Sequence, residues 1–374
     1  MAPIRVLIAD DSRVAREWIK ALIDAQPDMQ VIGEAGNGHE AVELALRLRP
    51  NIVTMDLEMP IMGGMQAIDT IMTTRAMPIL VVSGIADATN ACEALRLGAL
   101  DALRKPGYDD PEVAHLIERI RLLAGVSVIT RRKSALASQG TAASAQQPAF
   151  SQPCHNPPRP APVSDKPGHN APGLAGSSLP RQPHPKPYVF AIAASTGGPE
   201  ALARLLPQLP ADFPCPILIA QHITDGFAAG MAQWLNGLCA LPVTLAEADS
   251  LMRPGQIYIS PSELNLVLAA DGKRLLLEPP KPTDIYHPCC NRLLESVAVA
   301  CGQRAVGIIM TGMGKDGAQG IARIAEYGGL TLAQDAASSV IYGMNRVAIE
   351  SGAVQRVLPA ADIPQAMLEL AIAP

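Results

Sequence analysis

Residues 190–200 read FAIAASTGGPE. An apolar run ends at Ser195, and a threonine, two glycines and Pro199 follow it. Short apolar runs are typical of buried strands, glycine pairs of tight turns, and proline of the first turn of a helix. The stretch therefore predicts a strand, a turn and a helix, the repeating unit of α/β proteins with parallel sheets. Taken alone, it is compatible with a helix cap, a phosphate-binding loop or a turn that presents a nucleophilic serine.

The composition indicates globular domains. The chain has 374 residues, 48% hydrophobic and 17% charged, and a chain of this length usually forms two or three domains. Its seven cysteines form no C-x-x-C pair, which favours reduced thiols in a cytosolic protein. The apolar stretch near the N-terminus is too short for a signal peptide or a membrane span. We therefore expect a cytoplasmic protein without direct membrane insertion.

A segment between two folded parts has a different composition. Residues 127–187 are rich in Pro, Ala, Ser and Gln and hold twelve of the chain's 34 prolines. Such a segment cannot bury enough apolar surface to offset its ordering entropy, so a disordered linker is predicted. The domains are then residues 1–126 and 188–374. They are acidic once the basic linker is set aside, and only 3% of the chain is aromatic, so we expect no nucleic-acid partner.

On both sides of the linker, short β-branched runs alternate with longer helical patterns. This alternation predicts a doubly wound parallel sheet in each domain, in the α/β class. In the N-terminal domain, strands are predicted at residues 5–10, 30–35, 51–56, 78–83 and 101–105. In the C-terminal domain, they are predicted at residues 188–193, 215–220, 256–260, 266–269, 274–278, 305–310 and 330–334. Residues that follow parallel strands gather at one edge of the sheet, where ligands bind.

Four predicted strands of the N-terminal domain end in polar groups: Asp10 and Asp11, Asp56, Ser83, and Lys105. Carboxylates that converge repel one another unless a hard cation joins them, and Mg²⁺ prefers such oxygen ligands. Any one of these residues is more readily explained as a solvated loop residue. Their coincidence at successive strand ends favours a site.

The segments LIADDSR, TMDLEMP, LVVSG and RKPG resemble the receiver domain of two-component response regulators over residues 4–124. The resemblance implies a flavodoxin-like fold, a histidine kinase as partner and phosphorylation of Asp56. It implies that Mg²⁺ is held by four residues: Asp10, Asp11, Asp56 and, through its backbone carbonyl, Glu58. It also implies that Ser83 and Lys105 contact the phosphoryl group. Where the family usually has an aromatic switch residue, this chain has Ala102.

Three residues of the C-terminal domain follow predicted strands and suit hydrolytic chemistry: Ser195, His222 and Asp316. A serine hydroxyl is a weak nucleophile until a base takes its proton, and histidine, with an ordinary pKa of about 6.5, can do so near neutral pH. Asp316 would orient the imidazole and stabilise its cation. The domain's other histidine, His287, lies in a predicted loop and is the weaker candidate.

Each of these residues also has a plainer interpretation. Ser195 and Thr196 can cap the following helix. His222 can be a core histidine, and the TGMGKDG loop of Asp316 can be only a tight turn. A nucleotide-binding α/β domain is a further alternative, although neither glycine-rich loop has the spacing of a phosphate-binding motif.

Longer segments resemble the catalytic domain of chemotaxis protein-glutamate methylesterases over residues 188–370. They are ASTGGPEAL, AQH, GQIYISP, MTGMGKDGAQG and LAQDAASSVIYGMNRVAIESGAV. The resemblance implies a Rossmann-like domain with Ser195 as nucleophile, His222 as general base and acid, and Asp316 as its orienter. Two residues would help to form the oxyanion site: Thr196 and Met313.

The two resemblances together imply an enzyme that phosphorylation activates. It would hydrolyse γ-glutamyl methyl esters on chemoreceptor helices and release methanol without a cofactor, with deamidation of receptor glutamines as a possible second activity. Two stretches, residues 260–266 and 287–293, differ from the family's usual pattern. We expect both near the mouth of the cleft, where they affect substrate choice rather than chemistry. The main alternative is a phosphorylation-controlled protein that docks on receptors without hydrolysing anything.

Overall fold

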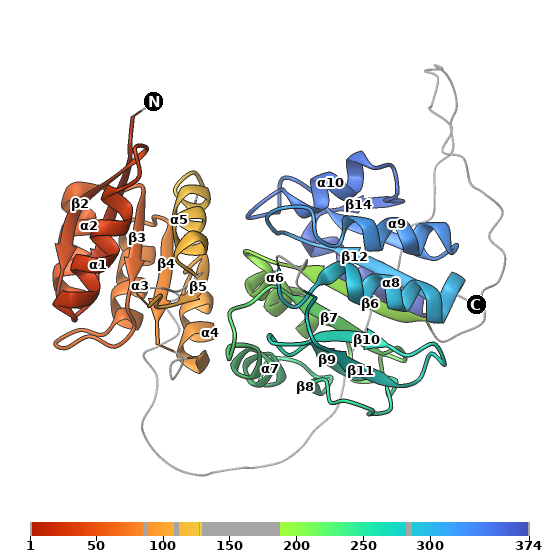
Figure 1. Ribbon diagram of the computed structural model, residues 1–374. Coiled ribbons are helices and arrows are strands. Elements are labelled where there is room, and N and C mark those ends of the chain that lie inside the picture. The colour runs from red at the N-terminus through yellow and green to blue at the C-terminus, as the bar shows by residue number, and fades with distance from the viewer. Residues whose placement is uncertain are drawn as a thin grey trace, which may run out of the picture. The chain divides into compact units, whose positions relative to one another are not determined.

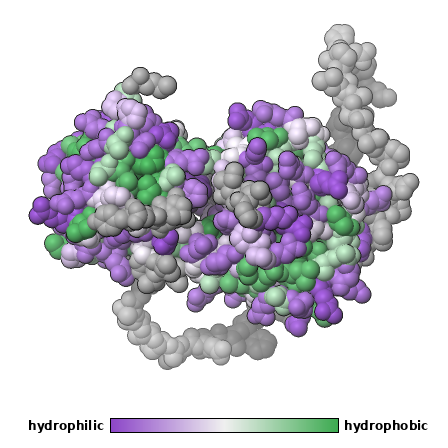
Figure 2. Space-filling view, viewed as in Figure 1, coloured by the Kyte–Doolittle hydropathy of each residue, from purple (hydrophilic) through white to green (hydrophobic). Residues whose placement is uncertain are grey.

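The computed structural model describes residues 2–84, 88–107, 112–126, 128, 188–281 and 286–372 (Figure 1). The predicted linker, residues 127–187, lies outside the described residues except for Val128. Among the described residues, no helix combines the length and the apolar character that a membrane crossing requires. Figure 2 shows hydrophilic residues over most of the face that it draws, with smaller hydrophobic areas between them.

The N-terminal domain is a parallel sheet in the order β2-β1-β3-β4-β5. Its strands are β1 (Ile4–Ala9), β2 (Met29–Ala35), β3 (Ile52–Met55), β4 (Ile79–Ser83) and β5 (Asp101–Arg104). Its helices are α1 (Arg13–Asp24), α2 (Gly38–Leu48), α3 (Gly64–Thr74), α4 (Ala88–Arg96) and α5 (Glu112–Leu123). All five predicted strands are confirmed, and the strand order is the expected flavodoxin-like one.

Local signals explain where these elements begin. Helix α1 follows Ser12, whose Oγ accepts from the N–H of Ala15 at 3.3 Å, and α2 follows Asn37, whose Oδ1 accepts from the N–H of Glu40 at 3.0 Å. Both residues are preferred N-caps. Strands β3 and β4 are buried along their whole length, as expected for parallel strands covered by helices on both faces. Helices α1 and α5 pack on one face of the sheet, and α2, α3 and α4 on the other.

The C-terminal domain is built on a second parallel sheet, in the order β14-β13-β12-β6-β7-β9-β8. Its strands are β6 (Val189–Ala194), β7 (Ile217–Gln221), β8 (Val243–Leu245), β9 (Ile257–Ile259), β12 (Ala305–Ile309), β13 (Leu330–Gln334) and β14 (Arg356–Leu358). Helices α6 (Gly198–Leu205), α7 (Ala228–Asn236) and α11 (Ile363–Ile372) pack on one face. Helices α8 (Cys290–Cys301), α9 (Ala318–Glu326) and α10 (Met344–Glu350) pack on the other. Short 3₁₀ turns are η2 (Leu206–Gln208), η3 (Gly302–Arg304) and η4 (Ala360–Asp362).

The winding of this second sheet reverses between β6 and β12. From β6 the chain continues on one side to β7, then to β8 at the edge, and then to β9, which lies between β7 and β8. It later forms β12, β13 and β14 on the other side of β6. Ligands of doubly wound sheets bind outside the carboxyl ends of the strands at such a reversal. The turns after β6 and β12 are therefore the expected position of a site.

Two features of the second domain differ from the prediction. The edge strands β8 and β14 were not predicted. Each has three residues, like the predicted strand β9, but β9 is fully buried whereas β8 and β14 are partly exposed, so they form no continuous apolar run. The strands predicted at 266–269 and 274–278 exist as β10 (Asn265–Leu268) and β11 (Leu275–Glu278). They form an antiparallel hairpin outside the parallel sheet.

Candidate active site

Ser195 lies in the turn between β6 and α6. Its N–H donates to the carbonyl of Thr311 at 3.0 Å, and its own carbonyl accepts from the N–H of Gly198 at 2.7 Å. The N-cap of α6 is Gly197, with φ of 78°, and no side chain caps the helix. The interpretation of Ser195 or Thr196 as a helix cap is therefore wrong. The turn fixes the serine by backbone contacts and leaves its hydroxyl for another use.

Gln221 connects the serine turn to the histidine loop. Its Nε2 donates to the carbonyl oxygens of Ser195 and His222, at 2.8 Å each. The N–H of His222 donates to the carbonyl of Ala194 at 2.9 Å. A Cβ at Gly198 would lie 2.0 Å from Oε1 of Gln221, so the second glycine of the turn allows this close approach. Pairing of neighbouring strands thus brings Ser195 and His222 to the same edge.

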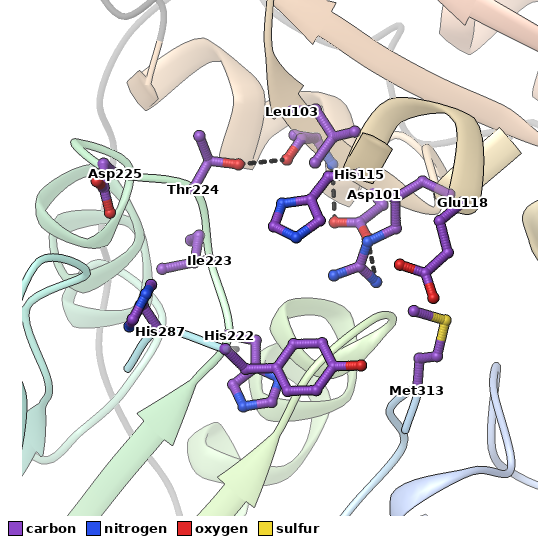
Figure 3. A pocket seen from close by; sticks show the side chains of 13 residues that line it. Asp101, Leu103, His115, Glu118, His222, Ile223, Thr224, Asp225, His287 and Met313 are labelled. Carbon is purple, nitrogen blue, oxygen red and sulfur yellow. Dashed lines mark hydrogen bonds and ion pairs between the residues drawn. The ribbon is translucent and has the colours of Figure 1, made fainter. Parts of the chain in front are cut away.

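His222 and Asp316 form a buried hydrogen-bonded pair, with Nε2 2.7 Å from Oδ2. The other ring nitrogen, Nδ1, is buried and has no hydrogen-bond partner within the described part of the chain. The ring of Tyr286 stacks on the imidazole, with centroids 5.0 Å apart and planes 9° apart. Figure 3 shows the side chains of His222, His287 and Met313 from close by. A ring that donates through Nε2 keeps a free lone pair on Nδ1.

The start of helix α8 holds the carboxylate of Asp316. The N–H of Cys290 donates to Oδ2 at 2.7 Å, and the N–H of Asn291 donates to Oδ1 at 2.9 Å. Both N–H groups belong to the first turn of the helix, where backbone N–H groups have no partner within the helix and the helix dipole is positive. Burial raises the pKa of Asp316, but the hydrogen bond and charge of His222 and the two backbone donors outweigh burial, so its pKa lies below the ordinary value. Asp316 is therefore ionised at neutral pH.

A second group of polar residues gathers at the carboxyl ends of the N-terminal sheet. Oxygens of Asp10, Asp11 and Asp56 lie within 4.8 Å of one another. Nζ of Lys105 lies 2.7 Å from Oδ2 of Asp56 and 2.9 Å from Oδ2 of Asp10. Oγ of Ser83 donates to Oδ1 of Asp56 at 3.3 Å. The structure thus brings together the five residues predicted from strand ends.

Comparison with known proteins places both domains in families. Residues 6–120 match the model of the response regulator receiver domain, and residues 190–367 match that of the CheB methylesterase. A protein-glutamate methylesterase/protein-glutamine glutaminase 3 of Paramagnetospirillum magneticum is 45% identical over 370 residues, which cover 98% of this chain and 96% of that protein. The chain belongs to the CheB methylesterase family.

A second curated relative agrees with this CheB methylesterase assignment. A protein-glutamate methylesterase/protein-glutamine glutaminase 2 of Anaeromyxobacter dehalogenans is 42% identical over 371 residues, covering 98% of this chain and 97% of that protein. The crystal structure of the Thermotoga maritima CheB methylesterase catalytic domain is 35% identical, with a TM-score of 0.48, and covers 50% of this chain and 99% of that one. Both predicted resemblances are confirmed, and neither the nucleotide-binding nor the non-catalytic alternative is favoured. The domain limits at 126 and 188 stay predictions.

The receiver domain of this CheB-family chain implies a Mg²⁺ site, and the residues at the strand ends are suited to hold that ion. Burial raises the pKa of Asp10, Lys105 lowers it and the charge of Asp56 raises it, with a net increase. Burial lowers the pKa of Lys105, but its hydrogen bonds to the two aspartates outweigh burial and raise it. Asp11 and Glu58 are exposed at the edge of the cluster. A crowded, partly solvated set of oxygens suits Mg²⁺, which keeps several waters.

The expectation for residues 287–293 was wrong in part. This stretch was expected to affect substrate choice alone, but its backbone holds Asp316, as described above. In addition, Sγ of Cys290 lies 3.3 Å from Nε2 of His222, and Sγ of Cys289 lies 3.6 Å from Oδ1 of Asp316. The helix that begins within this stretch could have indicated the contact, because carboxylates bind helix N-termini.

The second unusual stretch, residues 260–266, forms hydrogen bonds with two loops of the site. Oδ1 of its Asn265 accepts from the N–H of Cys289 at 2.7 Å. Oγ of its Ser262 accepts from the N–H of Gly226, in the loop that follows the histidine, at 3.1 Å. Asn265 and Ser262 are buried, so the stretch connects the two loops that carry the histidine and the helix start.

The two residues expected at an oxyanion site lie beside the serine. The carbonyl of Thr196 accepts from Oγ1 of Thr311 at 2.9 Å. Met313 follows Gly312, where a Cβ would lie 2.7 Å from Cβ of Ser195. Their part in binding an oxyanion stays a prediction.

Proposed function

We propose that this chain hydrolyses the methyl esters of glutamate side chains in chemoreceptors and deamidates receptor glutamines, and that phosphorylation of Asp56 activates it. The observation that carries the proposal is the 2.7 Å hydrogen bond between His222 and Asp316 beside the Ser195 turn. The names of the relatives, protein-glutamate methylesterase/protein-glutamine glutaminase, support the substrate class.

In the first step, Oγ of Ser195 attacks the ester carbonyl carbon while Nδ1 of His222 takes the hydroxyl proton. The ionised Asp316 stabilises the imidazolium through Nε2. Backbone N–H groups near Thr196 and Met313 would stabilise the negative oxygen of the tetrahedral intermediate. When the intermediate collapses, the C–O bond to the methoxy group breaks. The methoxy oxygen takes the proton from His222 and leaves as methanol.

In the second step, water attacks the acyl-enzyme. His222 takes a proton from the water, and the bond between the acyl carbon and Oγ of Ser195 breaks as the proton passes to the serine. The products are the free enzyme and a glutamic acid side chain, which becomes a carboxylate when its proton passes to solvent. A glutamine side chain enters the same sequence and releases ammonia in place of methanol. The steps use side chains of this domain and need no cofactor.

The receiver would control these steps. A histidine kinase or a small phosphodonor transfers a phosphoryl group to Asp56, which adds about −1.5 to −2 charges at pH 7. Mg²⁺, held by Asp10, Asp11, Asp56 and the carbonyl of Glu58, would neutralise charge during the transfer. Two residues already bonded to Asp56 would contact the new oxygens: Ser83 and Lys105.

The test uses chemoreceptor carrying labelled methyl groups, with and without a small phosphodonor. Ser195→Ala is expected to lower methanol release at least about 10³-fold, because the nucleophile and base act as a unit. Asp56→Asn is expected to keep the basal rate and lose the stimulation. Methanol release that survives Ser195→Ala would contradict the serine mechanism. No release by the wild type from any receptor would favour the docking alternative.

A further inference from the structure

The proposed mechanism does not use the thiol of Cys290. This residue is fully buried, and its Sγ lies 3.3 Å from Nε2 of His222. Its other polar contacts include the side chain of Asp316 and, as weak ones, the carbonyl oxygens of Ala220 at 3.4 Å and Ala194 at 3.9 Å. Three possible ligand atoms lie within 4.8 Å of one another, one each from Cys290, His222 and Asp316. All three side chains are buried.

We propose that Cys290, His222 and Asp316 form a binding site for Zn²⁺ or another thiophilic divalent cation, and that the bound ion switches the esterase off. An imidazole nitrogen, a thiolate and a carboxylate are the ligands that zinc prefers in proteins. The proposal that a metal binds here is argued from the cluster alone. The proposal that the metal inhibits the enzyme also rests on the proposed function.

The spacing of the donor atoms suits a four-coordinate ion. Typical zinc–ligand lengths place sulfur and nitrogen ligands about 3.5 Å apart in a tetrahedron, and nitrogen and oxygen ligands about 3.4 Å apart. Sγ of Cys290 and Nε2 of His222 are 3.3 Å apart, and Nε2 and Oδ2 of Asp316 are 2.7 Å apart. An ion would therefore require the hydrogen bond between His222 and Asp316 to open by a fraction of an ångström, and the third separation, between Cys290 and Asp316, lies within the 4.8 Å that joins the three ligand atoms.

The electrostatics also favour a cation at this point. Burial, the charge of Asp316 and the neighbouring Cys289 raise the pKa of Cys290 well above its usual value, so the uncomplexed thiol stays neutral. A divalent cation compensates both the thiolate and the carboxylate, and binding releases the thiol proton to solvent. The receiver cluster offers carboxylate oxygens from three aspartates, which suit Mg²⁺ and not a thiophilic ion.

Metal binding would prevent His222 from acting as a base, because it changes which ring nitrogen carries the proton. The proton on Nε2 must leave for that nitrogen to bind the metal, and in a neutral ring it moves to Nδ1. Nδ1 then has no lone pair to accept the proton of Ser195. Asp316, now a metal ligand, no longer stabilises an imidazolium. No oxidation or reduction is involved, so removal of the ion restores the enzyme.

The experiment titrates the full chain with Co²⁺ in excess Mg²⁺, which saturates the receiver site. We expect a thiolate-to-cobalt charge-transfer band with one equivalent of Co²⁺, and matching loss of esterase activity with Zn²⁺ that a chelator reverses. Cys290→Ser and Cys290→Ala are expected to abolish the band. Each should raise the inhibition constant for Zn²⁺ at least ~100-fold, since even an outer partner of a metal ligand costs ~10–100-fold in affinity.

The matched control is Cys301→Ala, at the other end of the same helix and also buried. It should keep both the band and the inhibition. A band that persists in both Cys290 variants, or no band in the wild type, would overturn the proposal. If the chain proves to have no esterase activity, the band still tests the metal site, so the two proposals fail separately. Thermal unfolding of each variant identifies any that fail to fold.

Discussion

At Gly312, the loop after β12 packs closely against the serine turn. A Cβ at this position would lie 2.7 Å from Cβ of Ser195 and 2.3 Å from Sδ of Met344. The N–H of Gly312 donates to the carbonyl of Ile341 at 3.0 Å, and its carbonyl accepts from the N–H of Met344 at 2.9 Å. The backbone of this loop therefore cannot move away without breaking its own hydrogen bonds.

Gly312→Ala should therefore displace Ser195 rather than its own loop. A displacement of about 1 Å at a reacting group can lower a rate about 10²-fold, and we expect methanol release to fall by that order. Gly237→Ala is the control, because a Cβ there would have no neighbour closer than 3.4 Å. An unchanged rate in Gly312→Ala would mean that the serine tolerates the shift.

The raised pKa of Asp10 gives a prediction for stability. Burial is the largest cause. The carboxyl of Asp10 therefore has a higher pKa in the folded chain than in the unfolded chain. As the pH rises from the lower of these pKa values through the higher one, ionisation of Asp10 lowers the free energy of unfolding. Asp10→Asn removes this decrease. In the absence of Mg²⁺, the variant should unfold at a higher temperature than the wild type at pH 7, and the difference should vanish below the ordinary aspartate pKa of about 3.9. Calorimetry at several pH values would measure this, and a lower unfolding temperature at pH 7 would contradict it.

At the scale of single elements, helix α8 does more than cover the sheet. Its first two N–H groups bind the carboxylate of Asp316, so the helix start is part of the charge balance of the site. The helix begins directly after Cys289, whose backbone is extended. Proline is tolerated at a first helical position and after an extended residue.

The pair Cys290→Pro and Cys290→Ala separates the N–H from the side chain. Both variants lose the thiol, but only proline lacks the N–H that donates to Asp316. A hydrogen bond to a charged group contributes about 1.5–3 kcal/mol, so kcat of the proline variant should be roughly ten- to a hundredfold below that of the alanine variant. Equal values of kcat would contradict a role for this N–H.

The buried interior strands were predictable and the edges were not. Strands such as β6, β7 and β12 are continuous apolar runs because helices cover both faces, and this pattern is visible in the sequence. The hairpin of β10 and β11 has equally apolar residues, and only the tertiary structure decides that it pairs outside the main sheet. Among the site residues, Ser195, His222 and Asp316 could be predicted because each follows a strand. The contacts of Cys290 and Tyr286 depend on how loops cross in space, which no local pattern encodes.

At the scale of the whole molecule, two sheets divide the chemistry. The receiver sheet carries an oxygen cluster suited to Mg²⁺, and the second sheet carries the hydrogen-bonded pair of His222 and Asp316, which the proposed mechanism uses without a metal. The two functions should therefore respond differently to metal removal.

Chelation of divalent cations should abolish stimulation by a phosphodonor and leave the basal esterase rate intact. Methanol release measured with EDTA, then with excess Mg²⁺ restored, would check this. Asp11→Asn should reproduce the loss of stimulation without a chelator, since Asp11 belongs to the oxygen cluster. A basal rate that falls on chelation would show that the esterase itself depends on a metal.

The imidazole of His222 contacts Asp316 through Nε2 and not through Nδ1, and this orientation has a spectroscopic consequence. In serine hydrolases whose aspartate binds Nδ1, the strongly hydrogen-bonded ring proton has one neighbouring C–H group, because Nδ1 is bonded to Cγ and Cε1. Here the corresponding proton of His222 sits between Cε1 and Cδ2. Its downfield magnetic resonance signal would show cross-relaxation to two ring protons instead of one, and that pattern would identify this orientation of the imidazole in solution.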